Sequence, residues 1–476
     1  MADMGDILPP SGVNYHYNSM PLAMPARAVT RKFRPQTTNS FQYSSGQRVI
    51  RIPLTSSGFM DPMHSYLRFK LRSIKTGGTA ERVLVDGAVS SIINRLRIEG
   101  SDGAELERIE NYNVLAAMLD TLVVSTPTGR SVDTVLMGKQ HSDAQPNAGQ
   151  VIATTTTGSD LDGTNSQVYI VRLASGLFNT DKFLPLGFIS GAGITLELQL
   201  EDPNTCLVDP SNDATSLDYI VSDVEFVGHI MEFSTEFEQA FGMMLQAPAG
   251  PGQGPVFFHG VTYRNYVYSV SNTSQFNIPV TERARSLKAL LVSIRDQATV
   301  TNKGENSISR RFMHDLTSYQ FKIGSFVFPQ QPVTFDSEGA SATGFRVSYA
   351  EALAEALKAY SALSDLRVAP EVLMQYNSVF GSQTSTWADP QAIIAIDLER
   401  FPGESGLKES GLNTAAQALA IEIDIKANNA LKKLRADNSL TPASGDNFVA
   451  TIRFDTFSMV DVMFRVDASG TISAYY

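Results

Sequence analysis

Five short segments in the first half of the chain recur in the second half in the same order. Each segment alternates apolar with polar residues, as a β-strand with one buried face does. Matching residues lie 221 to 226 positions apart: Ile52 and Ile278, Ser65 and Ser286, Ile98 and Ile323, Gln167 and Gln391, and Leu198 and Ile423. A chain of 476 residues is long for a single hydrophobic core. We therefore expect two tandem copies of one β domain of ordinary size.

A helix is predicted at the same place in both copies, between the third and the fourth matching segment. In residues 110–123 the apolar side chains fall on one helical face: Val114, Leu115, Met118, Leu119 and Leu122. Residues 348–363 form the second predicted helix, with Ser348 as N-cap and Glu351 three positions later, as in a capping box. A polar insertion follows each helix, at about residues 125–166 and 365–390.

A segment rich in Gly and Pro divides the two copies. Six of the nine residues 247–255 are Gly or Pro, so neither a helix nor a central strand can continue through them. We expect a Gly/Pro linker at 247–255, a first domain at 48–246 and a second domain at 256–476. Residues 1–47 contain five prolines and little periodicity, and we expect them to form an N-terminal arm.

The expected arm carries a basic cluster at Arg27, Arg31, Lys32 and Arg34, whereas the whole chain has a net charge of −11. Two interpretations stay open. The cluster could belong to a solvated, frayed terminus, or the arm could become ordered against a partner. The negative charge of the whole chain disfavours non-specific coating of nucleic acid.

Glu422 and Asp424 are a pair of carboxylates two positions apart between apolar residues. Such a pair could serve acid/base chemistry, bind a metal, or lie on the wet face of a strand. Their counterparts in the first copy are Glu197 and Gln199. Glutamine cannot exchange a proton at neutral pH, so the two copies do not share a carboxylate pair. We therefore favour a strand with one polar side.

No other group of residues has the spacing of a familiar catalytic or metal site. The six histidines lie at least 30 positions apart, and Cys206 is the single cysteine. The H-E-x-x-H, G-x-S-x-G and P-loop patterns are absent. We expect a protein that is not an enzyme, with no catalytic residues, no metal and no cofactor. Asp397 and Glu399 leave a carboxylate-based glycosidase site open as an alternative, although the one tryptophan, Trp387, offers little aromatic platform for a sugar.

Two tandem sandwiches, each with a helix-bearing insertion and preceded by a polar arm, resemble the double jelly-roll major capsid proteins of DNA viruses. This family includes adenovirus hexon and the shell proteins of tailless phages, virophages and polinton-like viruses. The resemblance is carried by residues 51–71, 93–119, 318–333 and 407–425. It implies an all-β fold of two tandem eight-stranded jelly rolls, at residues 48–246 and 256–476, each with a helix-bearing insertion loop.

The resemblance also implies a function and partners. A structural virion protein of this kind forms homotrimers, which act as pseudo-hexagonal capsomers and tile an icosahedral shell. Its partners would be neighbouring capsomers, penton and minor capsid proteins and an inner membrane, without sequence-specific binding of nucleic acid. The arm, with Arg27, Arg31, Lys32 and Arg34, would run along the inner face. The protein would assemble inside the host cell and reside in the virion capsid. The alternatives are a carbohydrate-binding or carbohydrate-active protein with two sandwiches, and a phage tail or receptor-binding β protein.

Overall fold

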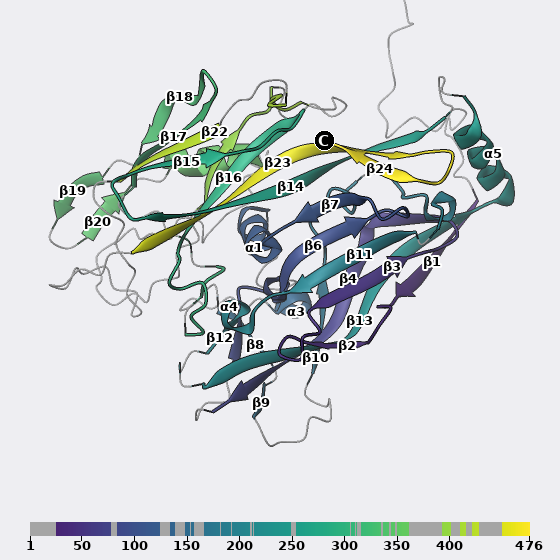
Figure 1. The fold of residues 1–476 in the computed structure, drawn as a ribbon, viewed down its shortest axis with the longest axis horizontal. Coiled ribbons are helices and arrows are strands. Elements are labelled where there is room, and N and C mark those ends of the chain that lie inside the picture. The colour runs from purple at the N-terminus through teal and green to yellow at the C-terminus, as the bar shows by residue number, and fades with distance from the viewer. Residues whose placement is uncertain are drawn as a thin grey trace, which may run out of the picture.

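The chain folds into two β-sandwiches in the computed structural model shown in Figure 1. The structure describes the following residues: 25–77, 83–123, 134–138, 148–152, 154–156, 166–180, 182–191, 193–209, 212, 214–248, 254–304, 306–309, 311, 316–334, 337–341, 344–347, 350–360, 393–400, 410–415, 421–427 and 450–476.

The first sandwich is built from two sheets whose main strands pair antiparallel. One sheet has the order β1 (Ala26–Phe33), β13 (Ser216–Phe233), β4 (Phe59–Thr76), β10 (Gln167–Val171), with β2 (Ser40–Gln42) and β9 (Thr154–Thr156) as short additions. The other sheet has the order β3 (Val49–Leu54), β11 (Ile194–Leu200), β6 (Ile93–Glu99), β7 (Glu105–Ile109). In both sheets neighbouring strands are mostly distant in sequence, which is the connectivity of a jelly roll.

The second sandwich repeats this strand order. One sheet is β14 (Val256–Ser271), β23 (Thr451–Val466), β16 (Leu287–Asp296), β21 (Ile394–Asp397), with β24 (Ile472–Tyr475) added beside β23. The other is β15 (Gln275–Val280), β22 (Ile421–Ala427), β17 (Leu316–Ile323), β18 (Phe326–Thr334). Each strand has a counterpart at the same place in the first sandwich. The predicted fold of two tandem eight-stranded jelly rolls is confirmed.

Smaller elements complete the described part of the chain. The helices are η3 (Val89–Ile92), α1 (Tyr112–Val123), α3 (Thr134–Met137), η5 (Leu186–Phe188), α4 (Pro203–Cys206), α5 (Thr235–Gln246) and α6 (Ala350–Ala359). The remaining strands are β5 (Val83–Asp86), β8 (Ala148–Ile152), β12 (Leu207–Val208), β19 (Ser337–Ser341) and β20 (Gly344–Val347). Helices α1 and α6 lie within the two predicted helical segments, between the third and fourth matching strands. Ser348, the predicted N-cap, lies outside the described residues.

Burial patterns explain why these segments form strands. Strand β15 buries Phe276, Ile278 and Val280 and exposes the residues between them, so one face meets the core and the other meets water. Strand β16 is different, because almost all of its residues are buried. Its run of apolar residues from Ala289 to Val292 matches a strand that is covered on both faces.

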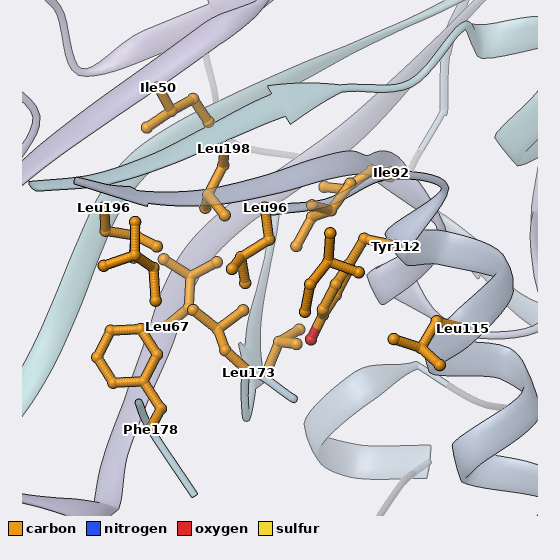
Figure 2. Packing of buried hydrophobic residues seen from close by; sticks show 14 of the residues in the cluster. Ile50, Leu67, Ile92, Leu96, Tyr112, Leu115, Leu173, Phe178, Leu196 and Leu198 are labelled. Carbon is orange, nitrogen blue, oxygen red and sulfur yellow. The ribbon is translucent and has the colours of Figure 1, made fainter. Parts of the chain in front are cut away.

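The hydrophobic core extends across both halves. In the first jelly roll, Leu67 of β4 faces Leu96 of β6 and Leu196 of β11, and Tyr112 of α1 lies beside them (Figure 2). The same cluster of buried residues continues into the second half through Phe457, Val462 and Phe464, among others. A second, smaller cluster lies between the two sheets of the second jelly roll. The two jelly rolls are therefore joined by a shared core.

Part of the expected N-terminal arm is a strand. Residues 26–33 form β1, which pairs along its whole length with β13 in the first sheet. Only Phe33 of this strand is fully buried, so an edge strand of this kind shows no alternation in the sequence. Residues 1–24 lie outside the described residues, as do 249–253 of the expected linker. The domain boundaries at residues 47 and 247–255 stay a prediction.

Candidate functional site

The carboxylates of Glu422 and Asp424 lie on the polar side of β22, as the strand interpretation predicts. Ile423 and Ile425 are fully buried on the other side. The amide of Asn277 donates to Glu422 over 3.3 Å, and Lys322 lies 3.4 Å from Asp424. Neighbours on β15 and β17 thus hold both carboxylates on the sheet surface. The arrangement resembles an ordinary cross-strand polar network and offers no acid/base geometry.

The described residues contain no group of three or more His, Cys, Asp or Glu side chains that could hold a metal ion. Within the same part of the chain, no helix is both long and apolar enough to cross a membrane. Asp397, one of the two carboxylates considered for a sugar site, is half-buried, and burial raises the pKa of its carboxyl group. Its neighbour Glu399 forms an ion pair with Lys288 over 2.5 Å. Trp387 lies outside the described residues.

Two of the four predicted basic residues bind one carboxylate on the outer side of the first sheet. Lys32 and Arg34 form ion pairs with Glu225 of β13 over 2.9 and 3.1 Å, and Arg68 of β4 reaches the same carboxylate over 3.2 Å. Burial by itself raises the pKa of Glu225, but hydrogen bonds from Lys32 and Arg34 outweigh it and hold the pKa below its ordinary value. These contacts fasten β1 to the sheet.

The other two predicted residues point to the other side of β1. Side chains alternate along a strand, so Arg27 and Arg31 lie on the side of the buried Phe33. The guanidinium of Arg31 donates to Ser56 over 3.0 Å. The structure therefore divides the four basic residues between the two faces of the first sheet. Their assignment to the inner face of a shell stays a prediction.

The most elaborate polar site in the described residues lies at the seam between the jelly rolls. Glu107 of β7 is 1% exposed. Its carboxylate accepts hydrogen bonds from Ser175 Oγ over 2.5 Å and from the Gly176 N–H over 2.8 Å. It also accepts one from Thr262 Oγ1 on β14, in the second jelly roll. Burial raises the pKa of Glu107, although these hydrogen bonds oppose the rise.

Two glycines allow the backbones of the jelly rolls to touch beside Glu107. A Cβ atom on Gly260 of β14 would lie 2.1 Å from the carbonyl oxygen of Gly176. No side chain fits at such a distance, so glycine is required there for close approach. Further along the seam, the Asn111 amide donates to Asn265 over 2.7 Å and Arg453 donates to Asn111 over 3.0 Å.

A second polar contact crosses the seam at the loop that follows β16. The carboxylate of Asp86 accepts hydrogen bonds from the backbone N–H groups of Ile308 and Ser309 over 2.5 and 3.2 Å. Behind this loop, Arg295 of β16 is 2% exposed and pairs with Asp455 of β23 over 2.7 Å. The buried ion pair of Arg295 and Asp455 favours one arrangement of the chain, because a buried charge without its partner would lower the stability of the fold.

Sequence analysis missed the seam. Glu107 stands in "ELERI", where it reads as one of several alternating charged residues of a strand, and its partners are 68 and 155 positions away. Helix α5 was missed too, although it had a local signal. Ser234 caps it by accepting from the Phe237 N–H over 3.4 Å, and Glu236 and Glu238 lie in its first turn. That is a recognisable helix start.

Comparison with solved structures finds proteins of the same architecture. A quasi-atomic structure of the PBCV-1 virus capsid matches with a TM-score of 0.57 at 9% identity, over 96% of this chain and 98% of that one. The Sputnik virophage structure matches with a TM-score of 0.56 at 11% identity, over 98% and 92%. The mavirus major capsid protein matches with a TM-score of 0.52 at 9% identity, over 99% and 96%.

These matches cover nearly the whole of both partners in each comparison, so they show the double jelly-roll fold over nearly all of the chain. Comparison by sequence gives a different outcome. No protein-family model matches the chain, and no curated protein matches it. At this level of identity the fold survives in the pattern of buried and exposed positions while individual residues differ.

Proposed function

We propose that this chain is a major capsid protein, which assembles as a homotrimer into pseudo-hexagonal capsomers of an icosahedral viral shell. The observation that carries the proposal is the duplication itself. Two jelly rolls with the same strand order share one core within a single chain. Three such chains would supply six similar jelly rolls, which suit a capsomer that occupies hexagonal positions in a lattice.

The seam between the jelly rolls supports this role. A shell subunit has to keep the angle between its two halves constant, because every copy meets the same neighbours. Close contact of Gly176 with Gly260, the buried carboxylate of Glu107 and the shared apolar core all oppose rotation of one jelly roll against the other. The role is structural rather than catalytic.

The proposed location is the virion capsid, after assembly inside the host cell. Neighbouring copies of the capsomer, penton and minor capsid proteins and an inner membrane are the proposed partners. The arm and the basic residues Arg27, Arg31, Lys32 and Arg34 are proposed to face the interior of the shell. A net charge of −11 limits non-specific adhesion to packaged nucleic acid.

Light scattering on the purified protein tests the proposal directly. We expect a mass of three times the chain mass of 51.8 kDa, and electron microscopy should show particles with pseudo-hexagonal outline. A protein that stays monomeric over a wide range of concentration, and binds or hydrolyses glycans, would contradict the proposed function.

A further inference from the structure

We propose that two open surfaces of this chain bind one another between copies. One is the edge strand β18 of the second jelly roll, together with the start of α6. The other is the outer face of the sheet formed by β1, β13 and β4 in the first jelly roll. The inference rests on the proposed function, since it names the surfaces through which the capsomer would form.

The contact within the chain joins two unlike surfaces. The first jelly roll contributes an edge, consisting of β7 and the residue before α1. The second contributes the outer face of its sheet at β14 and β23 (Figure 1). Glu107 on β7 binds Thr262 on β14, and Asn111 before α1 binds Asn265 and Arg453. Because each jelly roll has both an edge and a face, the described residues leave one edge and one face of a single chain unused.

The unused edge can be located by register. Glu107 lies opposite Ile98 of β6, and Phe326 lies opposite Ile323 of β17. Ile98 and Ile323 are equivalent in the repeat, so Phe326 occupies the position of Glu107. Glu107 is 1% exposed, whereas Phe326 is 63% exposed. A large apolar side chain that is open to solvent on an edge strand marks a surface for association.

The unused face is found in the same way. On β16, Leu290 and Val292 point into the core of the second jelly roll, while Ala289 and Leu291 belong to the core shared with the first. The equivalent strand β4 buries Leu67, Phe69 and Leu71, and the residues between them are Arg68 and Lys70. The first jelly roll thus covers the outer face of β16. The described residues leave the outer face of β4 partly exposed.

Charge favours a second copy of this chain as the occupant. Strand β1 takes the place of β14, and on the outer face Lys32 of β1 and Arg34 after it keep 51% and 71% of their side-chain surface exposed. In the contact within the chain, Asn111, the residue before α1, binds the second jelly roll. The corresponding start of α6 exposes Glu351, whose carboxylate accepts a hydrogen bond from the Thr334 N–H of β18 over 3.3 Å. An acidic group would therefore approach the basic strand. A charged face can also remain in water before assembly, unlike the apolar face of β16.

Such a contact has a direction, because an edge meets a face. Repetition of an unlike contact produces a closed ring or an open filament, depending on the rotation at each step. In a trimer the edge-to-face contact would occur six times, three times within chains and three times between them. Between chains, Phe326 of one copy would lie near β1 of the next.

Thiol cross-linking of the intact protein tests this arrangement. Cys206 is the single cysteine of the chain. It is fully buried, and burial raises the pKa of its thiol, so the native chain has no reactive thiol. The test variant carries Phe326→Cys and Thr30→Cys, because Thr30 is exposed on the same side of β1 as Lys32, and each substitution is also made alone. The control variant carries Asn277→Cys on β15, at the opposite edge of the same sheet, with Thr30→Cys. All are treated with a short bismaleimide and analysed on a denaturing gel.

We expect covalent dimers and trimers only from the variant with both Phe326→Cys and Thr30→Cys. Cross-linking of either single variant would indicate a symmetric contact and overturn the proposal. Trimers in light scattering that cross-link through Asn277→Cys but not Phe326→Cys would overturn these surfaces while leaving the proposed function intact. A monomer throughout would contradict both.

A point substitution provides an independent measurement. Phe326→Asp is expected to abolish the trimer and leave a folded monomer, because the side chain contributes little to the core. Val49→Asp is the control, since Val49 is 41% exposed on β3 at the opposite edge of the first jelly roll from β7. Loss of the trimer in both variants, or in neither, would overturn the assignment of β18.

Discussion

The residues of the seam show how a single buried group can hold two domains together. Glu107 satisfies backbone and hydroxyl donors from both jelly rolls, and its carboxylate would be costly to leave without partners. Its neighbour Glu105 lies on the same strand but is exposed and pairs with Arg97 over 2.7 Å. Two glutamates of one strand therefore have different roles, which only their surroundings reveal.

Replacing Glu107 with alanine is expected to lower the free energy of unfolding by about 3 kcal/mol, because buried donors lose their acceptor. Glu105→Ala is the matched control, and the loss of its exposed ion pair should cost at most about 1 kcal/mol. Urea unfolding followed by circular dichroism measures both. Equal effects of the two substitutions would show that Glu107 does not hold the seam.

The contacts of Glu225 predict a pH dependence for the attachment of β1. The pKa of Glu225 is held below its ordinary value, so its contribution to stability is complete above that ordinary value. The contribution is lost as the pH falls through the lowered pKa. Hydrogen-exchange protection of the β1 amides should decrease over this range. In Glu225→Gln, protection should be low at neutral pH and vary less with pH; an unchanged profile would argue against the ion pairs with Lys32 and Arg34.

At the scale of elements, β1 makes part of the N-terminal segment a strand of the first sheet. It is the edge strand of the first sheet and pairs with β13 over eight residues. Its basic side chains suit an exposed edge, since charge discourages unspecific pairing with other strands. The same strand therefore closes the first jelly roll and presents the surface proposed to meet a neighbouring copy.

Deletions of two lengths separate these roles. Removal of residues 1–24 retains β1, so the melting temperature should stay unchanged. Removal of residues 1–36 also deletes β1 and leaves the edge of β13 unpaired. We expect a lower melting temperature, with a decrease of about 2–4 °C for each kcal/mol lost in a domain of this size. Differential scanning calorimetry measures the difference, and equal melting temperatures would contradict the role of β1.

At the scale of the whole molecule, the two jelly rolls share one buried core. Phe457, Val462 and Phe464 of β23 belong to the same buried cluster as the core of the first jelly roll. A sheet that is apolar on both faces cannot be stable in water with one face uncovered. We therefore expect the two jelly rolls to unfold together and not as independent domains.

Expression of residues 256–476 alone tests this expectation. We expect the segment to bind a hydrophobic dye and to lack a cooperative unfolding transition, because Ala289, Leu291 and Phe457 would lose their cover. The full chain under the same conditions is the control. A segment that unfolds cooperatively and binds no dye would show that the second jelly roll is an independent domain.

The repeat that the sequence revealed was sufficient to predict the fold class, because inside-outside alternation is local and survives in each strand. Ile98 and Ile323, or Leu198 and Ile423, occupy equivalent buried positions in the two jelly rolls. The polar side of β22 was also predictable, since Glu422 and Asp424 alternate with buried isoleucines. Strand β1 was not, because an edge strand with one buried residue carries no periodic signal.

The sequence by itself determined that the chain is two copies of one β-sandwich, since the alternation of each strand specifies which face it buries. Only the tertiary structure decided how the copies are joined. The contacts of Glu107 with Thr262 and of Gly176 with Gly260 connect segments that are distant in the chain. No local pattern records such a pairing, because it depends on which edge meets which face. Within the part of the chain that the structure describes, the equivalent edge at Phe326 and the equivalent face at β1 remain open.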